Sequence, residues 1–497
     1  MQILRTWKAG GRSLASAGIV LLAWGAMGSL GAPVAVAQEG ATSGSSAAAS
    51  APAQPTGAAG AAAAGPASQL TAEALIGNLV DDLGPKYHDI EDGIDLFLKG
   101  DFSGARNAVD RSVKENPQLP PTSMIMARMY MMANNAKETQ AELERAAVEA
   151  PNDPEGYIIQ GDIALQRSEN VQANAMYEKG LEKAQSYAAN PKRKNLLLSR
   201  AYSGLAFVKQ AASDWTGSEK QLRDWLKIAP EDNNARERLA YVLFRQGTAD
   251  SKKAAYVLFG EIWKSDPTNR LRPEIAMARL FDQVDKDLPR AKNLMSQAQE
   301  KDPGLQTQLA VAQWALESNE MELAKKASDA ANAADAKSLE GRLIAGLLDR
   351  YNGRDADALK KFTEAHLQSP MNPIALNQIA LILINSDNAD DRKRAAEFAQ
   401  IGASVYNRFE QNYARESALV YAWVLHKMGR PRDAAQIVKT VLEKPGAVDS
   451  ASLYFAAEIL HKMGQDEPAK KILDAILSPN KNFLNRDKAA DLRKSLG

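Results

Sequence analysis

Histidine is the residue type whose spacing first suggests chemistry. The chain has four histidines, and two of them, His426 and His461, occur in the same segment, Leu-His-Lys-Met-Gly. Two imidazoles at equivalent positions can chelate a metal ion or act together as a pH switch. The alternative, which we favour, is that a duplication copied one solvent-exposed residue. His88 and His366 lie too far away in sequence to suggest a three-histidine site, so no metal site is predicted.

Methionine is concentrated in one short stretch, with Met124, Met126, Met129, Met131 and Met132 close together. Thioether clusters can bind copper(I). On a helix, however, Met124 and Met131 share one face while Met126 and Met129 share another, so the sulfur atoms do not converge. We therefore predict that these side chains pack in a core or a groove.

Motifs with a known catalytic mechanism are absent from the sequence. It has no phosphate-binding glycine loop, no dinucleotide-binding glycine pattern, no His-Glu-x-x-His and no nucleophile elbow. It contains no cysteine, which excludes disulfides and thiolate metal sites. The 61 basic residues are balanced by 61 acidic ones, whereas nucleic-acid binders usually have a basic excess. We predict a protein that is not an enzyme, uses no cofactor and binds no nucleic acid, with the charged runs 191–194 and 390–394 in solvated loops.

The first 37 residues have the layout of a signal peptide. Arg5, Lys8 and Arg12 precede an uncharged stretch, residues 13–37, that ends in Ala35-Val36-Ala37. Small residues at these last positions suit signal peptidase, so we predict cleavage after Ala37 and export to the periplasm or cell envelope. The alternative is an uncleaved membrane anchor, since the stretch is long enough to span a bilayer.

Residues 38–70 consist almost entirely of small and polar residues. No apolar periodicity is present to offset the entropy of ordering, which predicts a disordered linker. It can act as a spacer that holds the folded part away from a membrane, or it can be a solvated tail without a task.

The remainder of the chain is repetitive. The segment 425–429 returns as 460–464, and an alanine, Ala434 or Ala469, follows each glycine by five residues. Helix-length amphipathic runs begin near Leu70, and we find no convincing strand alternation. A period of about 34 residues of this kind is typical of helical hairpins.

This pattern resembles the tetratricopeptide repeat (TPR) family, which has small residues near positions ~8, 20 and 27, a turn glycine near ~15 and a proline near ~32. Residues 337–370 match it best. The resemblance implies an all-α, right-handed superhelical solenoid of about eleven hairpins over residues 71–497. The repeat residues that carry it are Gly93, Ala105, Pro117, Gly161, Ala173, Gly346, Gly353, Ala358, Pro370, Gly429, Ala434, Gly464 and Ala469.

Each of these residue types has a physical reason to occur at its position in the repeat. Small side chains let two helices approach closely, so we expect Gly161 to face Ala173 and Gly346 to face Ala358. Glycine at the turn adopts the left-handed conformation that ends the first helix. Proline cannot continue the second helix, because it lacks the N–H group.

The resemblance also implies a concave groove, lined by first helices, that binds a protein or peptide. Some TPR proteins clamp a chaperone's C-terminal carboxylate with lysine and asparagine on the first helix, but these positions hold other residues here, such as Ile158 and Asp162. We instead predict a partner-binding patch in the last two repeats, where aromatic anchors are surrounded by polar groups. The alternative is that its aromatic rings pack between hairpins. The patch residues are Trp423, His426, Tyr454, Glu458 and His461.

Taken together, these features predict a non-enzymatic interaction scaffold in a bacterial cell envelope, by analogy with complexes for envelope assembly, secretion or exopolysaccharide export. Two alternatives stay open. One is a TPR-containing enzyme subunit, which would need an inserted domain longer than the insertions seen. The other is a membrane-anchored regulator, which requires an uncleaved N-terminus.

Overall fold

The computed structural model describes residues 70–76, 88–267, 269–406, 411–443, 448–477 and 482–497, which are mostly helical and include no strand. In chain order the helices are α1 (Ala72–Ile76), α2 (His88–Leu98), α3 (Phe102–Glu115), α4 (Thr122–Met132), α5 (Ala136–Glu149), α6 (Glu155–Gln166), α7 (Asn170–Ser186), α8 (Pro191–Ala211), α9 (Trp215–Ile228), α10 (Asn233–Gln246), α11 (Ala249–Ser265), α12 (Pro273–Leu280), the π-helix η5 (Phe281–Asp285), α13 (Leu288–Lys301), α14 (Leu305–Glu317), α15 (Met321–Ala334), α16 (Leu339–Tyr351), α17 (Asp355–Gln368), α18 (Pro373–Leu383), α19 (Ala389–Tyr406), α20 (Gln411–Lys427), α21 (Pro431–Leu442), α22 (Ser450–Lys462), α23 (Asp466–Ile476) and α24 (Arg486–Ser495).

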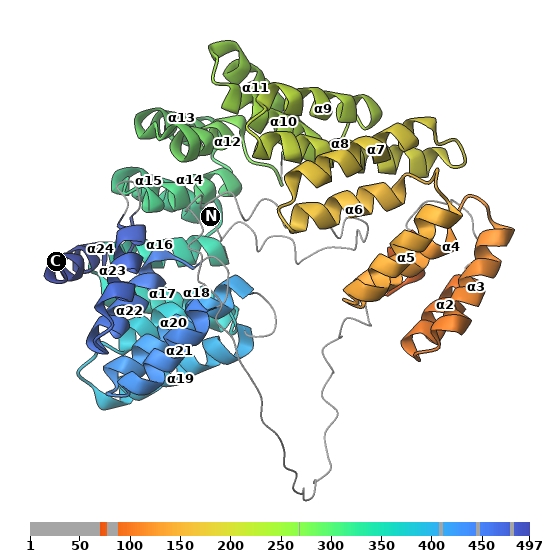
Figure 1. Cartoon of the computed structure of the whole chain (residues 1–497). Coiled ribbons are helices and arrows are strands. Elements are labelled where there is room, and N and C mark those ends of the chain that lie inside the picture. Colours follow the sequence, from red (N-terminus) through yellow and green to blue (C-terminus); the bar gives the residue numbers. More distant parts are fainter. Residues whose placement is uncertain (1–69, 77–87, 268, 407–410, 444–447, 478–481) are drawn as a thin grey trace, which may run out of the picture. The chain divides into compact units, whose positions relative to one another are not determined.

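Successive helices pair as hairpins. In the described residues, α2 to α23 alternate as first and second helices of eleven hairpins, with η5 continuing α12 (Figure 1). The predicted all-α helical-repeat fold and the predicted number of hairpins are thereby confirmed. Since a single hairpin cannot bury its apolar face alone, it packs on a neighbour in sequence, as α7 does on α8 and α17 on α18.

Two compact units make up the described chain, and the boundary between them lies at Val242 and Leu243, inside α10. In the first unit the core is divided, with one cluster in α1 to α4 and another in α6 to α8. In the second unit one continuous cluster extends from Leu343 to Ala489.

The turns inside the hairpins share one backbone conformation. In ten of the described hairpins a single turn residue has a positive φ, and it is glycine in five of them, Gly353 (φ +71°), Gly429 (+78°) and Gly464 (+75°) among these. The residue after it commonly donates its N–H to a carbonyl five residues earlier, as Arg354 does to Asp349. This Schellman arrangement satisfies carbonyl groups that the end of the first helix would otherwise leave without a partner. The proline expected to end the second helix follows α3 as Pro117 and α17 as Pro370.

The small residues of the first helix make room for side chains of the second helix. A Cβ built on Gly161 would lie 2.8 Å from the Tyr177 ring, and one on Gly346 would lie 2.8 Å from the Phe362 ring. The atoms nearest to these two added Cβ positions thus belong to the ring four residues beyond the expected alanine, Ala173 or Ala358. Gly93 shows the related arrangement with Val109 at 3.0 Å. The repeat alanines Ala105, Ala173, Ala358, Ala434 and Ala469 are all fully buried.

The charged runs predicted to be solvated loops are helical instead. Residues 191–194 form the first turn of α8, and residues 390–394 belong to α19. Arg193 is only 1% exposed. The prediction was wrong here because Pro191 at the first position and Asn190 as the N-cap start a helix, with the Asn190 side chain accepting from the Arg193 N–H at 3.0 Å.

The predicted signal peptide, residues 1–37, and nearly all of the predicted linker, residues 38–70, lie outside the described residues. Leu70, the last residue of that linker, is buried in the cluster formed by α1 to α4.

Candidate partner-binding surface

The five predicted patch residues come together on two consecutive first helices, α20 and α22. Trp423 and His426 are three residues apart on α20, and Tyr454, Glu458 and His461 are spaced by four and three residues on α22. Residues at these spacings share one helix face. Rings from both helices meet there, because the Trp423 and Tyr454 centroids are 6.2 Å apart.

Both aromatic rings of the patch are packed between the helices. Trp423 is 7% exposed and Tyr454 is 4% exposed. Trp423 stacks on Phe455 with the centroids 4.8 Å apart, and the Lys427 ammonium lies 4.6 Å from the centroid of the Trp423 ring. These rings therefore form an apolar floor, and a partner would meet the partly exposed His426, Glu458 and His461. We call these three residues the histidine surface.

Two hydrogen bonds orient the polar groups of the histidine surface. The Tyr454 hydroxyl donates to Glu458, and burial together with that carboxylate raises the pKa of Tyr454. His461 Nδ1 lies 2.7 Å from Asp466 Oδ1, a residue in the first turn of α23. Glu458 is thus engaged by a neutral hydroxyl, and His461 by a carboxylate.

His426 is the exception within the histidine surface. Its ring stacks on Trp423 with centroids 5.8 Å apart, and its Nδ1 atom is buried without a hydrogen-bond partner among the described residues. Burial lowers the pKa of His426, while Glu458 partly opposes that shift. The shift favours the neutral imidazole, and because Nδ1 is closed off from solvent, an incoming group would meet only the exposed part of this half-buried ring.

Metal binding gains no support at the histidine surface. His461 is already paired with Asp466. Nowhere in the described residues do three or more histidine, aspartate or glutamate side chains gather in a way that could hold a metal ion. The methionines of α4 also diverge, because Met124 packs in a small cluster with Leu143, whereas Met126 and Met129 pack in the cluster of α1 to α4.

A buried charge network in the first unit was missed by sequence reasoning. Glu155, at the start of α6, is fully buried and binds three arginines: Arg128 from α4, and Arg193 (2.8 Å) and Arg200 (3.6 Å) from α8. Burial alone would raise the pKa of Glu155, but the three guanidinium groups outweigh it and lower that pKa to about 2. No sequence signal brings residues from three helices together.

Two aspartates complete this network. Asp153 accepts two hydrogen bonds from Arg193 (2.6 and 2.8 Å), and Asp162 accepts from Arg200 (2.6 Å). Asp162 also accepts from the Tyr177 hydroxyl at 2.5 Å. Since the three carboxylates balance the three arginines, the network positions α4, α6 and α8 and leaves no net charge for a ligand.

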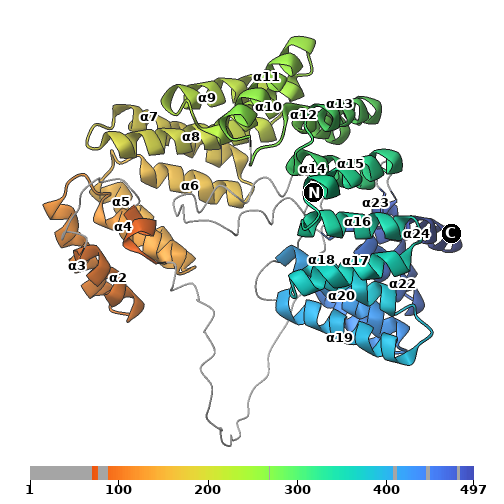
Figure 2. The same ribbon diagram turned by 180° about the vertical axis from the view of Figure 1, so that it is seen from behind.

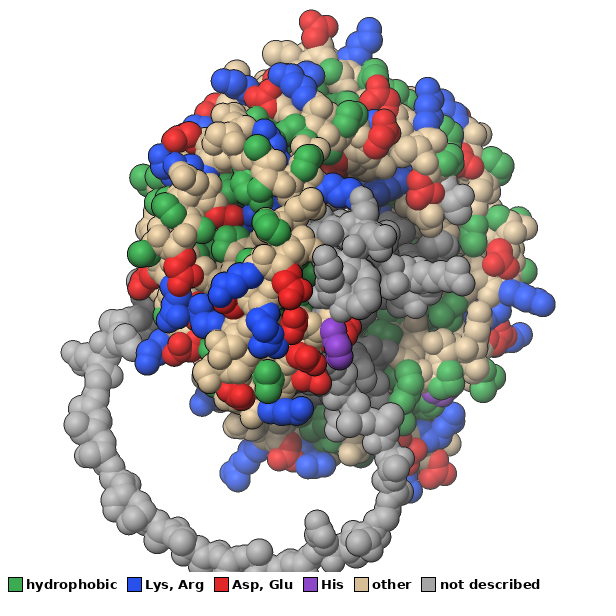
Figure 3. All heavy atoms as spheres, turned by 90° about the vertical axis from the view of Figure 1, so that its right-hand side faces the viewer, with side chains coloured by type: hydrophobic (Ala, Val, Ile, Leu, Met, Phe, Trp, Pro, Cys, Tyr) green, Lys and Arg blue, Asp and Glu red, His purple; other side chains and the backbone are tan. Residues whose placement is uncertain are grey.

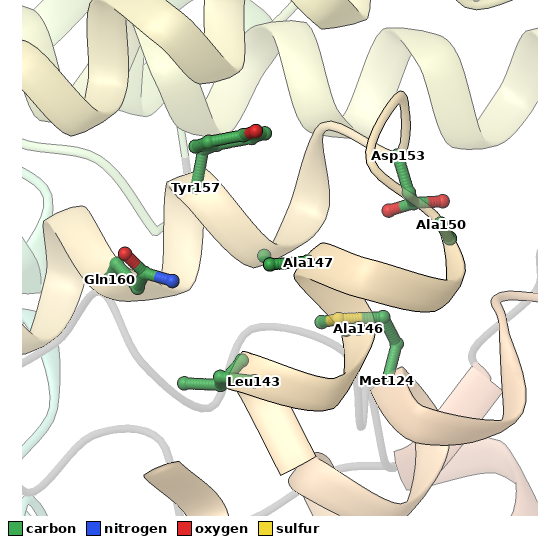
Figure 4. A pocket seen from close by; sticks show the side chains of 9 residues that line it. Met124, Leu143, Ala146, Ala147, Ala150, Asp153, Tyr157 and Gln160 are labelled. Atoms are coloured by element: carbon green, nitrogen blue, oxygen red, sulfur yellow. The ribbon is translucent and has the colours of Figure 1, made fainter. Parts of the chain in front are cut away.

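One pocket lies beside this network, among α4, α5 and α6. Figure 4 shows Met124, Leu143 and Ala146 on its apolar side and Tyr157 and Gln160 on α6. It contains a single carboxylate, from Asp153, which Arg193 already engages. Among its lining residues, the pocket thus offers no unpaired carboxylate.

No protein-family model matches the chain, and no curated protein does. Solved structures with some likeness include yeast Tom70, at 13% identity and a TM-score of 0.38, covering 83% of this chain and 95% of that one. A tetratricopeptide repeat protein from Parabacteroides merdae has 13% identity and a TM-score of 0.31, covering 60% of this chain and 98% of that one. The APC/C hetero-tetramer Cut9–Hcn1 has 13% identity and a TM-score of 0.38, covering 83% and 97%.

We assign the fold from the chain's own hairpins, with their left-handed turns and their glycine-to-ring contacts. The fold is TPR-like. Among the described helices of this TPR-like chain, none combines the length and the apolar character needed to cross a bilayer. On the face seen in Figure 3, basic and acidic side chains are interspersed, without a large patch of one sign.

Proposed function

We propose that the chain is a non-enzymatic scaffold of the cell envelope that binds a protein or peptide partner through the first helices of its hairpins. The observation that carries the proposal is the histidine surface, where three partly exposed polar side chains lie over an apolar floor of aromatic rings. Polar groups around a desolvated aromatic centre are typical of binding hot spots.

The envelope location rests on the predicted signal peptide and linker. Cleavage after Ala37 would release the chain into the periplasm, and residues 38–70 would act as a spacer. By analogy with other exported repeat proteins, we place the role in envelope assembly, secretion or exopolysaccharide export.

A cross-linked pull-down from envelope extract tests this proposal. The variant combines His426→Ala with His461→Ala, because these substitutions change the exposed groups and keep the aromatic floor formed by Trp423 and Tyr454. The matched control combines Gln436→Ala with Lys439→Ala, two exposed residues on the second helix α21. We expect the control to capture the same partner as the wild type and the histidine variant to lose it.

The proposal fails if the histidine variant captures the partner as well as the control does. It also fails if the wild-type chain captures no envelope protein under conditions in which the cross-linker modifies it. Trp423→Ala is a poor test, because emptying a packed aromatic site costs about 3 to 5 kcal/mol and would disturb α20 and α22 themselves.

A further inference from the structure

The C-terminal segment makes a contact far from its own place in the repeat series. In the second unit, Asn482 donates its backbone N–H to the Glu317 carbonyl at 3.0 Å. Its side-chain Nδ2 donates to the Leu316 carbonyl and to Asn319 Oδ1, each at 3.2 Å. These acceptors lie at the C-terminal end of α14 and in the turn that follows it. The two sides of this contact are far apart in sequence: Asn482 lies 166 residues after Leu316 and 163 residues after Asn319.

The next two residues extend the contact. Phe483 is buried and belongs to the continuous core cluster of the second unit. Burial raises the pKa of Tyr351 at the end of α16, and the Leu484 backbone lies close enough to the Tyr351 hydroxyl to oppose part of that rise. Figures 1 and 2 both show α23 and α24 beside α16. The hairpins from α14 onward are thus joined to the C-terminal segment outside the order of the repeats.

The chemistry of this contact is that of a bound peptide. The Leu316 carbonyl already accepts the Asn319 N–H at 3.3 Å within its own turn, whereas the Glu317 carbonyl accepts from Asn482 at 3.0 Å. The last carbonyls of a helix have no partner inside the helix itself, so a donor from elsewhere can bind there. Asn482 supplies such donors to the end of α14 through its backbone N–H and its side-chain amide. When a protein binds a peptide in this way, main-chain hydrogen bonds give the affinity and the pockets for the side chains give the specificity for its sequence.

We propose that the ends of α14 and α16 form an acceptor site for a peptide with the sequence Asn-Phe-Leu, and that the chain's own Asn482–Leu484 occupies this site as an intramolecular ligand. A segment tethered to its site has an effective concentration in the millimolar range, so an outside peptide competes only weakly until the segment is released. The site shares no residue with the histidine surface, and the two proposals therefore fail independently.

Peptide binding to the full chain tests the proposal. The probe is a fluorescent peptide of residues 482–490, and its matched control carries alanine in place of the residue equivalent to Asn482. The opened chain combines Asn482→Ala with Phe483→Ala, and Asn485→Gly is the control chain, because Asn485 has a left-handed backbone (φ +71°) that glycine adopts freely. By fluorescence anisotropy we expect the opened chain to bind the probe at least about tenfold more tightly than the wild type or the Asn485→Gly chain.

A second measurement uses the wild-type chain alone, so it holds even if the opened chain folds poorly. Peptide at about millimolar concentration should displace the tethered segment and speed amide hydrogen exchange in residues 482–485, while the alanine peptide should not. Equal effects of the two peptides, or no effect of either on exchange, would overturn the proposal.

Discussion

At the scale of single residues, several glycines of this chain lie directly against an aromatic ring, where a larger side chain would overlap the ring. Tyr177 lies between two of them, since a Cβ on Gly161 would be 2.8 Å from its ring and one on Gly204 would be 2.3 Å away. Phe362 is fully buried against Gly346. Glycine is needed at these positions for space, whereas at Gly353 it is needed for backbone conformation. The two kinds of glycine predict different responses to the same substitution.

Gly346→Ala should destabilise the second unit by about 1 to 3 kcal/mol, because the added methyl group overlaps the Phe362 ring in a closed site. Gly260→Ala is the matched control. Gly260 lies inside α11, and nothing is within 4 Å of its added Cβ, so this change should stabilise the protein by about 0.5 to 1 kcal/mol. Urea unfolding followed by circular dichroism measures both. Equal changes in the two variants would contradict the packing argument.

The stability of the protein should depend on pH through Glu155. Its pKa is lowered from 4.5 to about 2 in the folded protein, so its stabilising contribution is complete above about pH 4.5 and is lost as the pH falls towards about 2. Glu155→Gln leaves three arginines with one carboxylate fewer and should cost about 3 to 5 kcal/mol at neutral pH. The difference from the wild type should shrink as the pH is lowered to about 3.

Urea unfolding across this pH range measures the effect of Glu155→Gln. Glu178→Gln, an exposed carboxylate on α7, is the control and should change the free energy of unfolding by no more than about 0.5 kcal/mol at any pH. A Glu155→Gln deficit that stays constant from neutral to acid pH would show that the lost charge is not its cause.

At the scale of elements, the hairpin turn is the recurring unit, and its backbone is more uniform than its sequence. Five of the ten left-handed turn residues are not glycine: Asn134, Ser168, Ser213, Lys286 and Asn319. A side chain in this conformation costs roughly 1 to 2 kcal/mol, and asparagine tolerates it best. Ser168 and Ser213 are therefore strained positions that the hydrogen bonds of the turn maintain.

Ser168→Gly should stabilise the first unit by about 1 kcal/mol, because glycine adopts the positive φ without a steric penalty. Adding Ser213→Gly should roughly double the gain, since the two turns belong to different hairpins. Ser168→Ala keeps the Cβ and should give no such gain. The measurement is the midpoint of thermal unfolding. A lower midpoint for Ser168→Gly would mean that the serine side chain supports the turn.

At the scale of the whole molecule, the described chain is not uniformly stabilised. The hairpins α2 to α5 join α6 through a small apolar cluster that contains Met124, Leu143 and Ile159, together with the ion pair from Arg128 to Glu155. The hairpins from α16 to α23 share one large cluster. In a repeat array, stability is close to a sum of such neighbouring interfaces.

Hydrogen exchange should therefore show earlier opening of α2 to α5 than of α16 to α23. Ile159→Ala should increase that difference, because it removes the buried side chain that α6 contributes to the small cluster and costs about 2 to 5 kcal/mol locally. Ile379→Ala, a buried residue of the large cluster, is the comparison and should leave exchange in α2 to α5 unchanged. Uniform protection along the chain would contradict this view.

Export of the chain can be checked directly. We expect mass spectrometry of the protein recovered from the envelope fraction to find Gln38 as the first residue. Ala37→Leu should block this cleavage, because signal peptidase requires a small residue there. An intact Met1 in the wild-type chain would instead support the membrane-anchored alternative.

The sequence determined the helical hairpins, because each depends on local rules. Small residues such as Ala358, a turn glycine such as Gly353 and a proline such as Pro370 act within about one repeat, so their spacing alone predicts the all-α repeat fold and its eleven hairpins. Interpretation from charge misplaces residues 191–194, although Asn190 and Pro191 are local signals for the start of α8.

Only the tertiary structure decided what the repeats bring together. The burial of Trp423 and Tyr454, the three arginines around Glu155 and the contact of Asn482 with α14 all join residues from different hairpins. Such contacts depend on the rotation and spacing between neighbouring repeats, and these accumulate along the stack. A periodic sequence pattern predicts that hairpins stack, but it does not predict which residues face each other several repeats apart.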